Sequence, residues 1–169
     1  ITEGLVGSEM CIRDRVGAIP SPFDCYLLTR SIKTLSVRMK QHNENAIAVS
    51  NFLTNHSKIN KVFFPGIDER YKEVAAKQMD GFGGMMSFIL DTNIDGVKSF
   101  LKNLNIFTLA ESLGGVESLI EHPAIMTHAS IDPSIREKLG ISDTLLRISV
   151  GIEDVDDLIA DLDQALSKI

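Results

Sequence analysis

Hydrophobic and polar residues alternate along this chain in blocks that have either helical or strand periods. The clearest helical block covers residues 35–55, where apolar or small residues recur every three or four positions and share one face. The last block, residues 154–167, has the same period, and its acidic first turn suits the helix dipole. Short apolar runs bounded by turn residues indicate strands instead. The pattern predicts helices at about 21–32, 35–55, 69–79, 95–104, 133–139 and 154–167, and strands at 61–64, 85–90, 106–109, 116–120 and 145–150.

Turn and capping residues delimit these blocks. Ser21 or Asp24 is expected to cap the first helix, and Asp132 the short helix that starts with Pro133. The glycine-rich stretch 81–84 is followed by a strand pattern and no phosphate-loop lysine, so we interpret it as a turn that requires positive φ. Two helices leading into alternating strands and helices indicate an α/β or α+β fold, with one small sheet and helices mainly on one face.

The blocks also divide the chain into three parts. Residues 1–15 show no sustained period, and the string LVGSEMCIRDR is similar to translated sequencing adaptor. We interpret them as a leader that is foreign to the natural protein. Residues 16–55 are expected to be helices between domains, and residues 56–169 a C-terminal α/β domain.

Composition narrows the class of protein. The chain has 169 residues, with 23 acidic and 17 basic side chains and a net charge of −6. This acidic balance argues against nucleic acid as a partner. No apolar run reaches the roughly 20 residues that cross a bilayer, and no signal-peptide pattern is present. Two cysteines are too few for a disulfide scaffold, so we expect a cytoplasmic protein in which Cys25 is a small buried residue.

Few residues stand out as candidates for chemistry. The four histidines have no metal-binding spacing, and His42 lies on the apolar face of its helix, where we expect it to be packed. The loop Glu111–Gly115 places a carboxylate beside the hydroxyl of Ser112 and two glycines. Arg147 lies inside an apolar strand, where it either faces solvent or is held inward to bind a carboxylate. These residues alone do not specify a reaction.

Three longer segments indicate a class of reaction because they resemble a known family. They are GAIPSPFDCYLLTRSIKTLSVRMKQH, FTLAESLGGVESLIEHPAIMTHAS and LGISDTLLRISVGIEDVDDLIADLDQAL. Together they resemble the C-terminal part of the Cys/Met-metabolism family of pyridoxal-phosphate (PLP) enzymes, from residue 16 to the end. Within that family they are most similar to cystathionine γ-synthases and γ-lyases. The resemblance implies the C-terminal domain of a fold-type-I transferase, in an enzyme that works as a homo-oligomer, usually a tetramer.

The resemblance also implies roles for individual residues. Arg147 would bind the substrate α-carboxylate, and Ser112 would lie beside it. Glu111 would face the distal amino group or leaving side of the substrate, and Thr127 would line the neighbourhood of the site. The implied substrates are amino acids, namely cystathionine, cysteine or an O-acylhomoserine.

No segment matches the family motif that contains the Schiff-base lysine, or the residues that hold the cofactor. We therefore expect a C-terminal fragment that is inactive alone and exposes apolar surface on its first two helices, with Met39, Val49 and Leu53 as candidates. Three alternatives remain open: an O-acylhomoserine sulfhydrylase, a methionine γ-lyase relative, and a free-standing module that binds an amino acid for regulation.

Overall fold

The structure, a computed structural model, describes residue 17 and residues 19–169. The expected leader, residues 1–15, lies outside the described residues. The described residues divide into two compact units, one that ends at residue 36 and one of residues 37–169. The candidate functional residues all belong to the second unit.

The first unit contains α2 (Pro22–Ile32). Its start is the predicted capping arrangement: Ser21 Oγ accepts from the N–H of Asp24 at 3.1 Å, and the Asp24 carboxylate accepts from the N–H of Ser21 at 3.1 Å. No residue of α2 is buried. The expectation that Cys25 is buried is therefore wrong, because the helix has no covered face on which to place it. The exposed large side chains of α2 are Phe23, Tyr26, Leu27, Leu28 and Ile32.

The second unit contains a five-stranded mixed sheet. The strands are β1 (Ile59–Phe63), β2 (Met85–Leu90), β3 (Thr108–Leu109), β4 (Leu119–Glu121) and β5 (Leu145–Ser149), in the order β1-β2-β5-β4-β3. Only the pair β3–β4 is parallel among these strands. The helices are α3 (Leu35–Asn55, whose first two residues belong to the first unit), α4 (Lys72–Gln78), α5 (Ile94–Asn103), α6 (Pro133–Lys138) and α7 (Val155–Leu166). This mixed α/β architecture confirms the predicted fold class.

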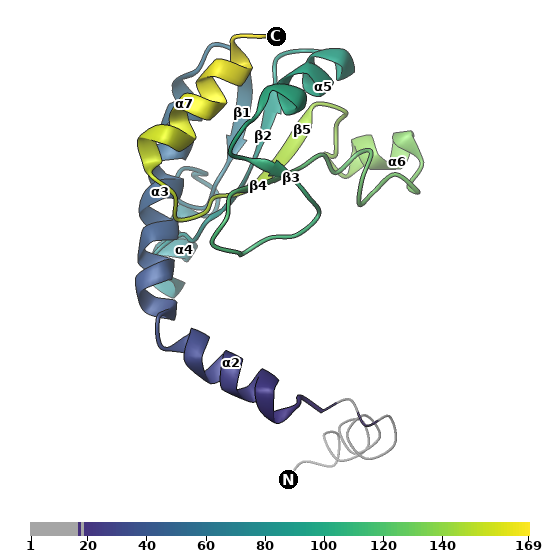
Figure 1. Cartoon of the computed structure of the whole chain (residues 1–169). Coiled ribbons are helices and arrows are strands. Elements are labelled where there is room, and N and C mark those ends of the chain that lie inside the picture. Colours follow the sequence, from purple (N-terminus) through teal and green to yellow (C-terminus); the bar gives the residue numbers. More distant parts are fainter. Residues whose placement is uncertain (1–16, 18) are drawn as a thin grey trace. The chain divides into compact units, whose positions relative to one another are not determined.

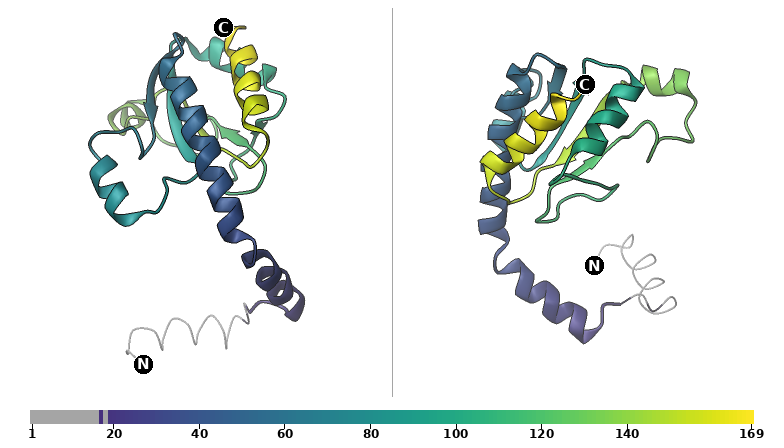
Figure 2. Two further views of the ribbon diagram at one scale, coloured as in Figure 1. Left: turned by 90° about the vertical axis from the view of Figure 1, so that its left-hand side faces the viewer. Right: turned by 45° about the horizontal axis from the view of Figure 1, so that its top comes forward.

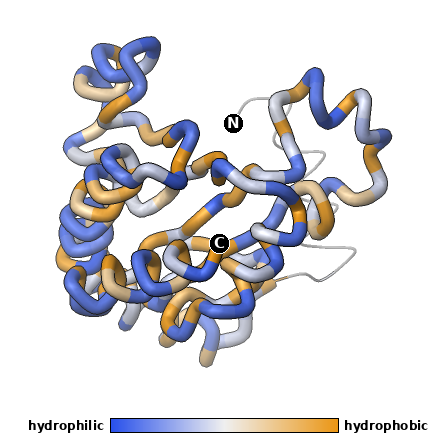
Figure 3. The backbone as a smooth tube through the Cα atoms, turned by 90° about the horizontal axis from the view of Figure 1, so that it is seen from above, coloured by the Kyte–Doolittle hydropathy of each residue, from blue (hydrophilic) through white to orange (hydrophobic). Residues whose placement is uncertain are grey.

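Helices α3, α5 and α7 cover one face of the sheet (Figures 1 and 2). The core lies between them and alternate residues of the strands, such as Phe88 on β2 and Ile148 on β5, both fully buried. Each such side chain stabilises the fold by roughly 1.5–3 kcal/mol through removal from water. Figure 3 shows hydrophobic and hydrophilic positions alternating along these helices. Val49 and Leu53 of α3 are fully buried in this core, so only Met39, which is 44% exposed, fits the expectation of an exposed apolar position.

Several boundaries differ from prediction: β1 begins two residues earlier than expected and β4 three residues later, and in two further elements side chains capture backbone groups. The strand expected at 106–109 is reduced to β3, since the Asp161 carboxylate accepts the N–H groups of Asn105, Ile106 and Phe107 at 2.8–3.1 Å. The helix expected from residue 69 begins three residues later. There Asp68 accepts from the N–H and guanidinium of Arg70 and forms a turn before the helix.

Polar side chains of α3 fix the backbone that follows β5. His42 is 4% exposed, and its Nδ1 lies 2.7 Å from the carbonyl oxygen of Val150. This confirms that His42 is packed, and because a carbonyl only accepts, Nδ1 holds the proton. Asn45 donates to the carbonyls of Gly151 at 3.0 Å and Glu153 at 2.8 Å. The helix therefore holds the end of the strand that contains Arg147.

Two glycines of the 81–84 stretch have different roles. Gly83 has a φ of 73°, as the turn interpretation requires. Gly84 allows a close approach of two backbone segments, because a Cβ there would lie 2.8 Å from the carbonyl oxygen of Val150. Among the helices of the described residues, none has both the length and the apolar character to cross a membrane.

Candidate functional site

A row of residues crosses the sheet on the face opposite the helical core. The strand register pairs Phe63 with Ser87, Ser87 with Arg147, and Arg147 with Glu121. Side chains alternate between faces along a strand, so Arg147 points away from the core to which Leu146 and Ile148 belong. Its side chain is 28% exposed, which is intermediate between the solvent-facing and inward positions considered from the sequence.

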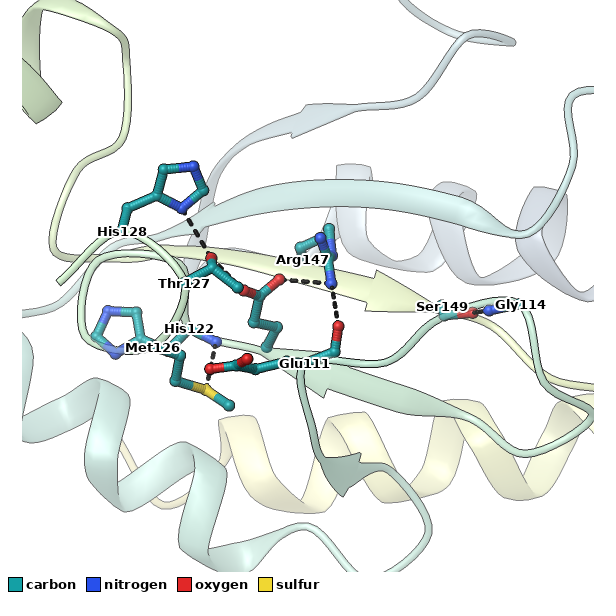
Figure 4. A network of polar contacts seen from close by, with 9 residues as sticks. Glu111, Gly114, His122, Met126, Thr127, His128, Arg147 and Ser149 are labelled. Carbon is teal, nitrogen blue, oxygen red and sulfur yellow. Dashed lines mark hydrogen bonds and ion pairs between the residues drawn. The ribbon is translucent and has the colours of Figure 1, made fainter. Parts of the chain in front are cut away.

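Arg147 is held by one ion pair and one hydrogen bond. Its Nη2 lies 2.6 Å from Oε2 of Glu121, a residue that is only 1% exposed, and donates to the backbone carbonyl of Glu111 at 3.1 Å. Figure 4 shows these contacts as dashed lines. A guanidinium has five N–H donors, and no described residue accepts from the three on Nε and Nη1. These three donors remain for a ligand.

The other oxygen of Glu121 is also occupied. Oε1 accepts from the hydroxyl of Thr127, whose oxygen lies 2.7 Å from Nδ1 of His128. Thr127 therefore belongs to the same network as Arg147, although it reaches the arginine through Glu121. Figure 4 shows the contact between Thr127 and His128.

The loop 111–115 is fastened to the strand of Arg147. The N–H of Gly114 donates to Ser149 Oγ at 2.9 Å, and Ser149 lies two residues after Arg147 on the same face. Gly114 adopts a φ of 76°, which other residues rarely tolerate. Beyond the loop, Glu153 accepts from the N–H of Ser118 at 2.6 Å and from its hydroxyl at 2.8 Å. The loop is thus anchored at its C-terminal side.

The four residues expected from the sequence do not all make the expected contacts. Arg147 and Thr127 join one network, and Glu111 contributes its carbonyl oxygen to it. The carboxylate of Glu111 and the hydroxyl of Ser112 are exposed and bond to no described residue.

Sequence reasoning missed Glu121 and Ser149. A signal existed for both. Glu121 ends an apolar strand in which a lone charge requires a partner, and Ser149 shares a strand face with Arg147 at a spacing of two.

Two hollows adjoin these residues. One of about 180 Å³ is lined by Arg147 with Ser87, Met85 and Phe63. The other, of about 370 Å³, is mainly apolar and is bordered by Ser149 and Gly114 together with residues of α3 and the 82–85 turn. Arg147 and Ser149 thus each border a hollow large enough to admit small-molecule groups.

Solved structures share this fold. The crystal structure of cystathionine γ-synthase from Xanthomonas oryzae pv. oryzae in complex with aminoacrylate and cysteine superposes with a TM-score of 0.84 at 49% identity, over 90% of this chain and 40% of that one. A second structure of the same enzyme, in complex with cystathionine, gives the same values. The domain therefore has the architecture of part of a cystathionine synthase.

The chain belongs to the Cys/Met metabolism PLP-dependent enzyme family, whose model matches residues 3–167. The matched range includes most of the expected leader. Cystathionine γ-lyase of Dictyostelium discoideum is 54% identical over 158 residues, which are 93% of this chain and 41% of that protein. Cystathionine β-lyase of Lactococcus lactis subsp. cremoris (strain MG1363) is 50% identical, with the same coverage. The chain spans about two fifths of the length of these relatives.

The described residues do not fit the cofactor that the family uses. A PLP site needs a lysine aimed into a cavity, and no lysine borders either hollow beside Arg147. Lys58 is bonded to backbone carbonyls at the C-terminus, and Lys61 lies over the ring of Phe63 with its nitrogen 4.8 Å from the centroid. Within this part of the chain, no three metal-binding side chains cluster either. The two hollows beside Arg147 therefore contain no candidate for the imine-forming lysine.

Proposed function

We propose that this chain is the substrate-side part of a PLP-dependent trans-sulfuration enzyme, a cystathionine γ-synthase or γ-lyase. Family membership and the names of its relatives support the class of reaction. The observation that supports a role for this domain in substrate binding is the half-buried guanidinium of Arg147, which keeps three unused N–H donors beside an anchored loop.

Arg147 binds the α-carboxylate of an amino-acid substrate in this proposal, and Ser112 lies beside that carboxylate. Charge-assisted hydrogen bonds are short and about twice as strong as neutral ones, so they fix the orientation of the bound amino acid. Orientation of a reacting bond contributes several kcal/mol to catalysis in general. The contribution of this domain is therefore to hold the substrate in one position while the cofactor chemistry takes place on residues outside it.

Glu111 contacts the distal ammonium of cystathionine in this proposal. Its carboxylate is exposed and has no partner among the described residues, so it is available to an incoming cation. Such a contact serves both the joining of cysteine to an activated homoserine and the cleavage of cystathionine. Glu111 therefore does not distinguish a synthase from a lyase.

The proposal extends to the whole enzyme. The Schiff-base lysine and the phosphate-binding residues belong to a part outside this chain, so the chain alone does not catalyse the reaction. The complete enzyme is a homo-oligomer. We place it in the cytoplasm because the sequence contains only two cysteines.

Ligand titration of the 169-residue chain tests the role of Arg147. Isothermal calorimetry with L-cystathionine is expected to show binding that weakens at least tenfold in Arg147→Met, because the carboxylate loses its charged donors. Cystathionine dimethyl ester, which lacks both carboxylates, is expected to bind the native chain no better than it binds the variant. The matched control is Arg70→Met, which removes an exposed arginine whose partner is Asp68. Equal affinity of the native chain and Arg147→Met would overturn the proposal, as would absence of any binding.

The cofactor part of the proposal has its own test. The chain is incubated with PLP, reduced with borohydride and mapped by peptide mass spectrometry. No single lysine is expected to be labelled above background. Stoichiometric labelling of one lysine would show that this chain has its own cofactor site.

A further inference from the structure

We propose that Glu121 is a positioning residue, which together with Thr127 and His128 sets the direction in which Arg147 presents its guanidinium. The inference rests on the proposed function of Arg147 and deepens it. It gives Thr127 a role through Glu121 in place of a direct contact with substrate.

Burial makes the orientation of Glu121 specific. A carboxylate that is 1% exposed is costly unless both of its oxygens have partners. Oε2 has Arg147 at 2.6 Å, and Oε1 has the hydroxyl of Thr127. Because no other described residue bonds to this carboxylate, these two contacts decide where it points.

The hydrogen bonds of the network have a defined direction. Thr127 has one hydroxyl proton, and an ionised carboxylate only accepts, so that proton goes to Glu121. The nearby Nδ1 of His128, 2.7 Å from the Thr127 oxygen, must then be the donor of that contact. The hydrogen bonds therefore run from His128 to Thr127 and from Thr127 to Oε1 of Glu121, whereas Oε2 of Glu121 has the ion pair with Arg147 and accepts no hydrogen bond from a described residue.

Glu121 orients the guanidinium of Arg147 toward a ligand, but it does not strengthen the attraction between that guanidinium and an anion. A carboxylate beside the guanidinium partly neutralises its charge, and so does not raise its attraction for a second anion. An unrestrained arginine, however, loses rotamer entropy when a ligand immobilises it. Glu121 restricts Arg147 before a ligand arrives, and leaves Nε and Nη1 facing a fixed side of the sheet.

Side-chain NMR of the 169-residue chain tests this directly. In the native chain the Nη groups of Arg147 are expected to give separate resonances, because the ion pair slows rotation of the guanidinium. Glu121→Gln is expected to average these resonances. Thr127→Val removes only the hydroxyl that holds Glu121, and is expected to give intermediate averaging. The backbone resonances of β2 and β5 should be unchanged in both variants.

The control is the pair of the exposed Arg70 and the partly buried Asp68, joined at 2.7 Å. Asp68→Asn is expected to change the resonances of Arg70 and to leave those of Arg147 unchanged. Native-like Arg147 resonances in both folded site variants would overturn the inference. If Glu121→Gln does not fold, Thr127→Val decides the question, since Thr127 lies in an exposed turn.

A titration separates this inference from the proposed function. The native chain is expected to bind L-cysteine more tightly than D-cysteine, and Glu121→Gln to reduce that ratio, because a mobile arginine accepts either geometry. An immobile Arg147 that responds to no amino acid would overturn the proposed function and leave the positioning role intact. An unchanged ratio in Glu121→Gln would count against positioning.

Discussion

The hydroxyl of Ser149 accepts a hydrogen bond of 2.9 Å from the N–H of Gly114. This bond joins the loop that contains Glu111 and Ser112 to the strand that contains Arg147. The two halves of the proposed carboxylate site are thus connected by a side chain that bears no charge.

Ser149→Ala removes the acceptor of that bond. We expect a loss of about 1 kcal/mol in unfolding free energy, faster hydrogen exchange of residues 111–115, and weaker cystathionine binding. Ser142→Ala is the control, because the buried Oγ of Ser142 bonds to no described residue and should cost little. Equal exchange of the loop in Ser149→Ala and the native chain would contradict the prediction.

Asn45 offers a test of how α3 holds the end of β5. Its amide donates to two backbone carbonyls, those of Gly151 and Glu153. Asn45→Asp replaces the donor with a buried carboxylate facing two carbonyl oxygens. We expect a loss of about 3 kcal/mol or more at pH 7, measured by urea unfolding.

At low pH, protonation of the carboxyl group in Asn45→Asp should restore part of the lost unfolding free energy, because a neutral acid can donate a hydrogen bond to a carbonyl oxygen. Asn51→Asp on the exposed face of the same helix is the matched control and should be nearly neutral. Similar losses at the two positions would mean that Asn45 does not hold this segment.

Asp161 should contribute stability that depends on pH. Burial raises its pKa, but hydrogen bonds from the N–H groups of Ile106, Asn105 and Phe107 and from Gln164 outweigh this and lower the pKa below 3.8. A lowered folded pKa gives stability that is present above the unfolded value and is lost as pH falls through the folded value.

Asp161→Asn is therefore expected to cost about 2 kcal/mol at pH 7. The difference from the native chain should shrink below pH 3.8. Denaturant titrations at several pH values measure it. A difference that stays constant down to pH 2 would show that ionisation of Asp161 is not the source.

His122 should also make stability depend on pH, in a higher pH range than Asp161 does. It is fully buried, and burial lowers its pKa below 6.5, although the bond from Nε2 to the carbonyl of Asp143 at 2.9 Å opposes the shift. The folded chain then binds fewer protons than the unfolded chain, so stability falls as pH drops below 6.5 toward the folded pKa. Melting temperatures from pH 8 to 5 should show this decline, and His122→Gln should reduce it. His56→Gln, which alters a side chain that is 19% exposed, is the control and should keep the decline.

Periodicity was sufficient to predict the elements whose residues have one buried side. Strand β2 matches its prediction of 85–90, and α3 and α7 match to within one residue at each end, because their apolar stripes define them locally. The shortened β3 could not be predicted in this way. Asp161, whose carboxylate accepts the backbone N–H groups of residues 105–107, lies 54 to 56 positions after them in the chain.

The fold class could be predicted from residue types at local spacings, and the family from three segments that resemble it, whereas the carboxylate-binding role of Arg147 stays a prediction that the resemblance implies. Tertiary structure decided what holds that arginine. Glu121 faces Arg147 only because β4 and β5 pair in one register, and Thr127 reaches Glu121 only because the turn after β4 folds back over it. Strand register and the burial of a charge depend on contacts between distant segments, and these contacts exist only when the core has formed.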